Sequence, residues 1–187
     1  MGSVVRLPFR LGTVLVSAVA LCVGAHAQTL KIGDPVPPFK VGRWLKGEPV
    51  AKLEKGKVYV IDFWGILCEP CIEAIPRVSA LARKYGGRAM FIGVSLVRWS
   101  KSQPYPDGSL PNQLAFMKKH AKDMDYHVAA DTSDGYMAIH LFGALGLESI
   151  PNAVVVGRNG RVAWVGDVDG LDQAVSKAVA APAPTTR

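Results

Sequence analysis

The chain has 187 residues, of which 49% are apolar, a length and composition typical of one globular domain with a sizeable core. Its formal net charge is +7, but the lysines and arginines are spread over several predicted elements, without an arginine-rich run that also carries aromatic residues. The composition therefore argues against nucleic-acid binding. Three cysteines are also too few for a small fold held together by several disulfides.

The first 27 residues have the pattern of a secretory signal peptide. Arg6 and Arg10 form a basic start, residues 11–23 are apolar, and Ala25-His26-Ala27 is a small-residue cleavage site. The apolar stretch is shorter than the roughly 18 residues that a membrane span needs. We therefore expect export to the periplasm or an equivalent compartment, with an uncleaved membrane anchor as the alternative.

The remaining chain divides into one domain, residues 28–180, and a flexible tail, residues 181–187. Residues 30–56 are rich in Gly, Pro and Lys, and they predict an N-terminal strand or hairpin. Residues 58–63 form a nearly continuous apolar run, as expected of a strand that is buried on both faces of a sheet.

A helix and a second strand follow that run. Apolar residues recur at the three- and four-residue steps of an amphipathic helix: Ile72, Ile75, Val78, Leu81 and Ala82. Pro76 should kink this helix, and Gly86-Gly87 should end it. Residues 89–95 predict a second buried strand, which completes a β–α–β unit with parallel strands.

The second half of the domain alternates between short predicted elements. A Pro/Gly-bearing loop is expected at 98–111, a helix at 114–121, a strand at 127–130, a helix at 134–145 and a closing helix at 171–180. Residues 153–157 and 161–166 flank an Asn-Gly turn, which is the clearest hairpin signal in the chain.

The chemistry-bearing feature is the motif Cys68-Glu69-Pro70-Cys71, which follows a buried strand and opens a helix. This placement is typical of thiol–disulfide exchange sites. A zinc site is disfavoured because the sequence has no second CxxC and no Cys-and-His spacing to complete one. Cys22 lies in the expected signal peptide, so the exported chain keeps a single pair of cysteines. An inert structural disulfide is the alternative.

The combined motifs resemble the TlpA/ResA-like exported branch of thioredoxin-like proteins. Residues 62–71, DFWGILCEPC, are similar to the branch's dithiol signature, and Ser149-Ile150-Pro151 is similar to its cis-proline loop. The segment from about Gln113 to Ala130 resembles the branch's central insertion. The resemblance implies an α/β thioredoxin fold, with a central mixed sheet, helices on both faces, a cis-Pro loop and a helix–strand insertion.

Two positions depart from the pattern of the branch. The tryptophan that precedes the first cysteine in the family is Leu67 here, which changes the apolar surface beside the thiol. Some reductants of the branch carry a glutamate three residues after the second cysteine, where this chain has Ala74. Glu73 points elsewhere on a helix, so that role is not transferred to it.

Cys68 is the expected nucleophile, because unpaired N–H groups and the helix dipole at a helix N-terminus favour a thiolate. Cys71, one turn inward, is expected to be the buried resolving thiol. Pro70 is tolerated in the first helical turn. The Glu69 carboxylate should disfavour the thiolate and make the pair more reducing, unless it points into water and matters little.

Asp62 shares a face with Val58 and Val60 in a strand that is otherwise apolar. Burial should raise its pKa, and a carboxylate able to accept a proton is what Cys71 needs when it becomes a nucleophile. Asp62 also occupies the position of the buried aspartate of thioredoxin. A hydrogen-bonded structural aspartate is the alternative.

The resemblance further implies a substrate-binding loop. Pro151 should follow a cis peptide bond, and the Ile150 backbone should face the dithiol and bind an extended client segment. Trp64 should pack under this site and contribute to substrate binding.

The sequence thus predicts a periplasmic thiol–disulfide oxidoreductase that acts on a client protein with a disulfide or dithiol. The reductant is the favoured direction. A membrane thiol donor would re-reduce the pair, and no cofactor or metal is expected. Cu(I) binding or delivery by the two thiolates is the alternative from another class. A peroxide-reducing enzyme is disfavoured, because that family has threonine where this chain has Gly65.

Overall fold

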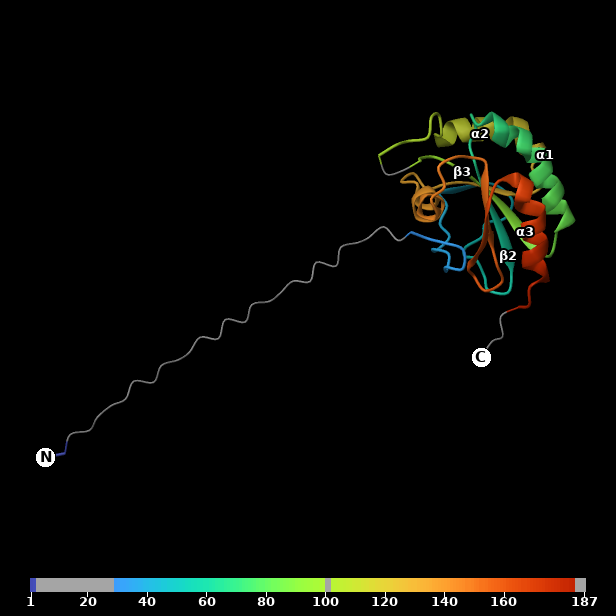
Figure 1. Ribbon diagram of the computed structural model, residues 1–187. Helices are drawn as coiled ribbons and strands as arrows, with labels where there is room; N and C mark the ends of the chain where they lie inside the picture. The colour runs from blue at the N-terminus through green and yellow to red at the C-terminus, as the bar shows by residue number, and fades with distance from the viewer. Residues whose placement is uncertain (3–28, 100–101, 184–187) are drawn as a thin grey trace.

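The computed structural model describes residues 1–2, 29–99 and 102–183 (Figure 1). Nearly all of the expected signal peptide and residues 184–187 of the expected tail lie outside the described residues. Within the described chain, one mixed sheet has the strand order β1-β4-β3-β2-β5-β6. The strands are β1 (Arg43–Lys46), β2 (Val58–Trp64), β3 (Ala89–Ser95), β4 (His127–Ala130), β5 (Asn152–Val156) and β6 (Val162–Gly166).

The centre of the sheet is the predicted β–α–β unit. Strands β2 and β3 are parallel, in register from Val58 opposite Ala89 to Trp64 opposite Ser95. Every residue of β2 is buried, because helices cover both faces and leave no solvated side. Strand β5 pairs with β2 on the other side and is antiparallel to it.

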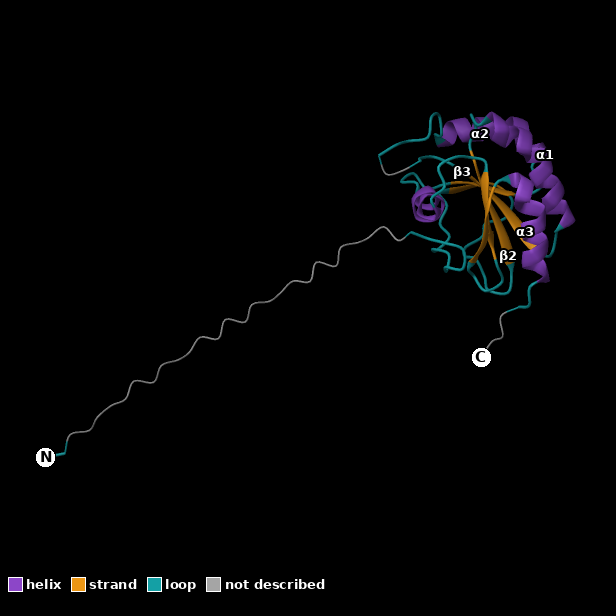
Figure 2. Cartoon of the chain, in the orientation of Figure 1, coloured by secondary structure: helices purple, strands orange, loops and turns teal. Residues whose placement is uncertain are grey.

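Helices lie on both faces of the sheet, as the fold prediction requires (Figure 2). The helices are α1 (Glu69–Lys84), α2 (Leu110–His120) and α3 (Val168–Ala180), with the short helices η1 (Ala121–Asp123), η2 (Ala138–Phe142) and η3 (Gly143–Leu145). Residues of α1, α2 and α3 pack on the face that contains Val60 and Trp64. Residues of η2 pack on the opposite face, against Ile61 and Phe63.

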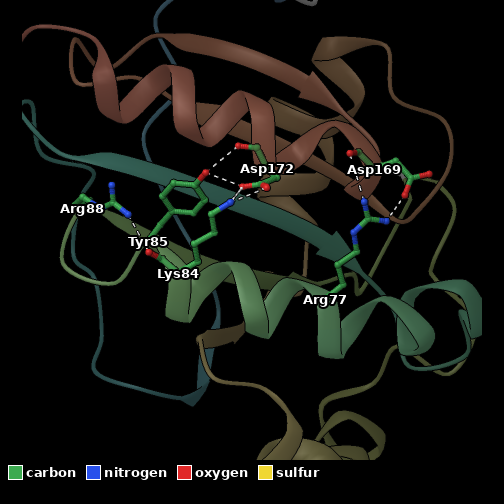
Figure 3. Close-up of polar contacts among 6 residues, drawn as sticks. All are labelled: Arg77, Lys84, Tyr85, Arg88, Asp169 and Asp172. Carbon is green, nitrogen blue, oxygen red and sulfur yellow. Dashed lines mark hydrogen bonds and ion pairs between the residues drawn. The ribbon is translucent and has the colours of Figure 1, made fainter.

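Helix α1 runs without interruption from the dithiol to Lys84, with Pro76 inside it and Tyr85 as its C-cap. Its far end is fixed to α3 by polar contacts (Figure 3). The Tyr85 hydroxyl donates to Asp172 Oδ1 at 2.6 Å, and Lys84 Nζ lies 2.7 Å from the same carboxylate. Nearer the dithiol, Arg77 pairs with Asp169. These contacts hold the two helices together on one face of the sheet.

Of the strand and the hairpin expected in residues 30–56, the structure has the strand, β1, together with an isolated bridge between Pro35 and Arg161. The 134–145 prediction needs correction. The helix expected from Asp134 begins later and is irregular, as the π-helix η2 followed by the 3-10 helix η3. The Asp131 carboxylate accepts hydrogen bonds from the Met137 and Ala138 backbones, so this side chain fixes where the helical segment begins.

The other predicted elements are confirmed to within a few residues. The β5–β6 hairpin turns at Gly160, whose φ of +74° is the left-handed conformation that favours glycine. The central insertion is α2 and β4, and α2 starts three residues before the expected Gln113. Strand β4 pairs parallel to β3 and so extends the sheet beyond the β–α–β unit.

Candidate active site

The dithiol is a disulfide at the start of α1. Cys68 and Cys71 are bonded to each other, and Cys68 is the N-cap residue of the helix. The Cys68 sulfur accepts a hydrogen bond from the Cys71 backbone N–H at 3.2 Å. Cys71 is 2% exposed, whereas Cys68 is half-buried and in reach of solvent. The strand–helix junction thus places one sulfur at the surface and the other in the core, as the sequence predicts.

The loop before β5 brings a second segment to the dithiol. The peptide bond between Ile150 and Pro151 is cis, which confirms the prediction for this loop. The Cys68 sulfur lies 3.7 Å from the Ile150 carbonyl oxygen, although the two residues are 82 positions apart. Because β5 pairs with β2, the start of β5 lies beside the end of β2, where the dithiol follows.

Asp62 lies in the middle of the buried face, as predicted. Its side chain belongs to the face of β2 that carries Val60 and Trp64, and this face packs against Cys71. Asp62 is 5% exposed, and its Oδ1 atom has no hydrogen-bond partner among the described residues. Burial raises the pKa of Asp62 to about 7, so the carboxyl can both hold and release a proton near neutral pH.

Trp64 is 2% exposed and lies beneath the site, and its ring packs against Phe116 of α2 with 5.3 Å between ring centroids and the planes tilted by 46°. Its ring is too deeply buried to touch a client protein directly. Leu67, by contrast, is 58% exposed beside Cys68, and so it offers an apolar surface next to the reactive sulfur. Glu69 and Pro70 are both exposed in the first turn of α1.

Two residues near Asp62 were missed by the sequence analysis. Gly93 of β3 lies opposite Asp62, and a Cβ atom there would come within 3.0 Å of the Tyr126 ring and 3.1 Å of Trp64 Nε1. Tyr126 is buried, and both burial and the nearby Asp62 raise the pKa of its hydroxyl. A glycine inside an apolar strand indicates close approach of another group, so Gly93 could have been recognised from the sequence.

Tyr105 was also missed, although it reaches the segment just before the dithiol. It lies in the loop between β3 and α2, and a Cβ atom on Gly65 would be 2.3 Å from its hydroxyl oxygen. The only sequence signal is a pair of aromatic residues, Trp99 and Tyr105, in a Pro/Gly-bearing loop, which does not say where either ring packs.

Within residues 1–2, 29–99 and 102–183, no group of three or more His, Cys, Asp or Glu side chains is arranged to hold a metal ion. None of the helices in these ranges is both long enough and apolar enough to cross a bilayer.

The mixed sheet, the helix-capping disulfide and the cis-proline loop define a class of proteins, the thiol–disulfide oxidoreductases with a thioredoxin-like fold. Within that class, the chain belongs to the Redoxin family, which matches residues 31–181. It is similar to the protein FixW of Rhizobium leguminosarum, with 29% identity over 154 residues, 82% of this chain and 68% of FixW.

A second relative is the thiol-disulfide oxidoreductase ResA of Bacillus thuringiensis subsp. konkukian (strain 97-27). The two are 27% identical over 136 residues, which is 72% of this chain and 69% of that ResA. Among solved structures, the thioredoxin domain of a thiol-disulfide oxidoreductase from Bacteroides vulgatus superposes with a TM-score of 0.60. It is 21% identical and covers 80% of this chain and 99% of that domain, so it supports the fold.

Proposed function

We propose that the protein reduces disulfides in client proteins in a compartment outside the cytoplasm, using Cys68 as the nucleophile. The observation that carries this proposal is the asymmetry of the dithiol. Cys68 is half-exposed at the start of α1 and lies beside the cis-proline loop, whereas Cys71 is buried behind it. Only one sulfur is therefore open to a client disulfide.

In the reduced protein, the Cys68 thiolate attacks one sulfur of the client disulfide. A mixed disulfide forms between Cys68 and the client, and the other client sulfur leaves as a thiolate that takes a proton. The Cys71 thiolate then attacks the Cys68 sulfur, which restores the internal disulfide and releases the second client thiol. Two electrons pass from the dithiol to the client, and a membrane thiol donor then reduces the Cys68–Cys71 disulfide again.

Asp62 serves the second step in this proposal. Cys71 is 2% exposed, so its proton needs an acceptor inside the protein when it becomes a nucleophile. Asp62 lies on the same packed face, and burial raises its pKa to about 7. Its carboxylate is therefore basic enough to accept that proton at neutral pH.

Client binding would use the cis-proline loop. The Ile150 carbonyl group is next to the Cys68 sulfur and can accept a hydrogen bond from an extended client segment. Pro151 fixes the shape of this loop, and Trp64 supports the site from beneath. The exposed Leu67 adds an apolar contact beside the attacking sulfur.

Export is part of the proposal, and it is supported by the basic, apolar and small-residue pattern of residues 1–27. An oxidising compartment outside the cytoplasm would supply disulfides as substrates. Fractionation of cells that express the full chain tests this point. A protein of full mass that stays in the cytoplasm would contradict it.

The test of the exchange roles uses single cysteine substitutions in a Cys22→Ser background, so that only the site thiols react. Reduced protein is mixed with a peptide that carries one internal disulfide. Cys71→Ser should accumulate a mixed disulfide between Cys68 and the peptide. The protein with both site cysteines should form this mixed disulfide only transiently, and Cys68→Ser should form none. Equal adducts at either cysteine would overturn the assigned order of attack, and no peptide reduction by the wild-type site would overturn the function.

The role of Asp62 has its own kinetic test. Asp62→Asn keeps the size of the side chain but cannot accept a proton, so release of the peptide from the mixed disulfide should slow about tenfold or more. The first attack by Cys68 should keep its rate. Quenched-flow mass spectrometry separates the two steps, and an unchanged release rate would remove the acid–base role.

A further inference from the structure

Tyr105 is held by backbone hydrogen bonds and ring packing in the loop that joins β3 to α2. Its backbone N–H donates to Val97 O at 2.9 Å, and its carbonyl oxygen accepts from the Gly108 N–H at 3.1 Å. Its ring lies 5.3 Å from the Trp99 ring, and the side chain is 7% exposed. The position of the hydroxyl is therefore fixed by the packing of the loop and of the ring.

This hydroxyl reaches the segment between β2 and the dithiol. A Cβ atom on Gly65 would lie 2.3 Å from both the hydroxyl oxygen and the ring carbon that carries it, so only glycine allows this approach. Burial raises the pKa of Tyr105, and the nearby backbone N–H of Leu67 partly offsets that rise. Tyr105 thus packs closely against Gly65, and its hydroxyl lies near the Leu67 backbone.

These contacts bear directly on the geometry of Cys68. The Cys68 N–H donates to Gly65 O at 3.1 Å, so the four residues from Gly65 to Cys68 form one turn. The turn sets the direction of the Cys68 sulfur, which caps α1 by accepting the Cys71 N–H at 3.2 Å. A hydroxyl packed against Gly65, at the first position of the turn, limits the movement of the turn relative to the helix.

We propose that Tyr105 is a positioning residue for the nucleophile, because its hydroxyl holds the Gly65–Cys68 turn so that the Cys68 sulfur stays aligned with the start of α1. This inference rests on the proposed role of Cys68 as the attacking thiol. It also accounts for Gly65, which leaves the space that the tyrosine hydroxyl occupies.

The alignment matters because a helix N-terminus stabilises a thiolate only over a short distance. Hydrogen bonds from the first turn and the positive end of the dipole act on a sulfur that lies against the unpaired N–H groups. When the turn is released, the sulfur spends less time in that position and the thiolate fraction at neutral pH falls. Removal of the Tyr105 hydroxyl should therefore shift the pH profile of Cys68 reactivity to higher pH.

The experiment compares Tyr105→Phe with Tyr85→Phe in the reduced full chain. Both changes delete one hydroxyl from a buried tyrosine, but the Tyr85 hydroxyl bonds Asp172 at the far end of α1. Alkylation rates of Cys68 with iodoacetamide are measured from pH 5 to 10 and assigned by peptide mass. We expect Tyr105→Phe to slow Cys68 alkylation at pH 7 about threefold and to move the midpoint upward, with the Tyr85→Phe profile unchanged.

Gly65→Ala is the second variant, because its methyl group would displace the Tyr105 hydroxyl without changing the tyrosine. It should shift the profile in the same direction. A Tyr105→Phe profile identical to that of the wild type, or an equal shift in Tyr85→Phe, would overturn the inference. If wild-type Cys68 reacts no faster than Cys71, the proposed function itself fails, which is a separate result.

Discussion

Asp62 is the residue whose environment departs most from what its chemistry prefers. A carboxyl group that is 5% exposed, with an unpartnered oxygen, is stable in this position mainly when it is protonated. The unfolded chain would release this proton near pH 4, whereas burial raises the pKa of the folded carboxyl to about 7. The folded protein therefore binds one more proton than the unfolded chain between these two values.

The consequence is a stability that falls as the pH rises. Relative to Asp62→Asn, the free energy of unfolding of the oxidised wild-type protein should fall by on the order of 3 kcal/mol from pH 4 to pH 7. The difference is constant about one pH unit or more below the unfolded pKa, and constant again about one unit or more above pH 7. Urea unfolding of both proteins across this range measures it. Parallel curves would show that Asp62 titrates in the folded protein as it does in the unfolded chain.

Glu69 is a second residue with a testable electrostatic effect. It is exposed in the first turn of α1, where its negative charge acts against a Cys68 thiolate. Glu69→Gln should therefore stabilise the reduced form and raise the reduction potential by on the order of 10 mV. Glu73→Gln removes the same charge from the next turn and is the matched control. Equal potentials for the two variants would assign no special effect to the position beside the sulfur.

At the scale of elements, the polar contacts between α1 and α3 are unequal in strength (Figure 3). Asp172 accepts the buried Tyr85 hydroxyl at 2.6 Å, whereas Asp169 is 81% exposed in its pair with Arg77. Asp172→Ala should lower the free energy of unfolding by about 1 kcal/mol, since it leaves the tyrosine hydroxyl without that partner.

Asp169→Ala is the control for this change, because an exposed ion pair contributes little to stability. Chemical denaturation of the oxidised protein compares the two variants with the wild type. Equal losses would mean that the surface charges, and not the buried hydroxyl, hold α1 to α3.

The elements that the sequence predicts well are those with strong periodicity. The apolar run of β2, the helical spacing after Cys71 and the turn at Gly160 each have a local cause that tertiary contacts do not override. The segment after Asp131 is different. Its carboxylate binds backbone N–H groups six and seven residues later, and its π-helical course depends on packing against the sheet. Residue spacing alone cannot reveal either effect.

At the scale of the whole molecule, the site is made of segments that only the fold brings together. The dithiol and Asp62 are near in sequence and could be predicted from their strand and helix. The Ile150–Pro151 loop could be predicted only through family resemblance, because its contact with Cys68 depends on the pairing of β5 with β2. Tyr105 could not be predicted, since it reaches Gly65 through the course of an irregular loop.

The proposed role as a reductant is tested most directly by the reduction potential of the Cys68–Cys71 pair. The full chain is equilibrated in graded thiol–disulfide buffers, and the Cys68–Cys71 pair is quantified by alkylation and peptide mass. We expect a value near that of thioredoxin, about −270 mV. A value near that of the oxidant DsbA, about −120 mV, would contradict it and reverse the proposed direction of electron flow.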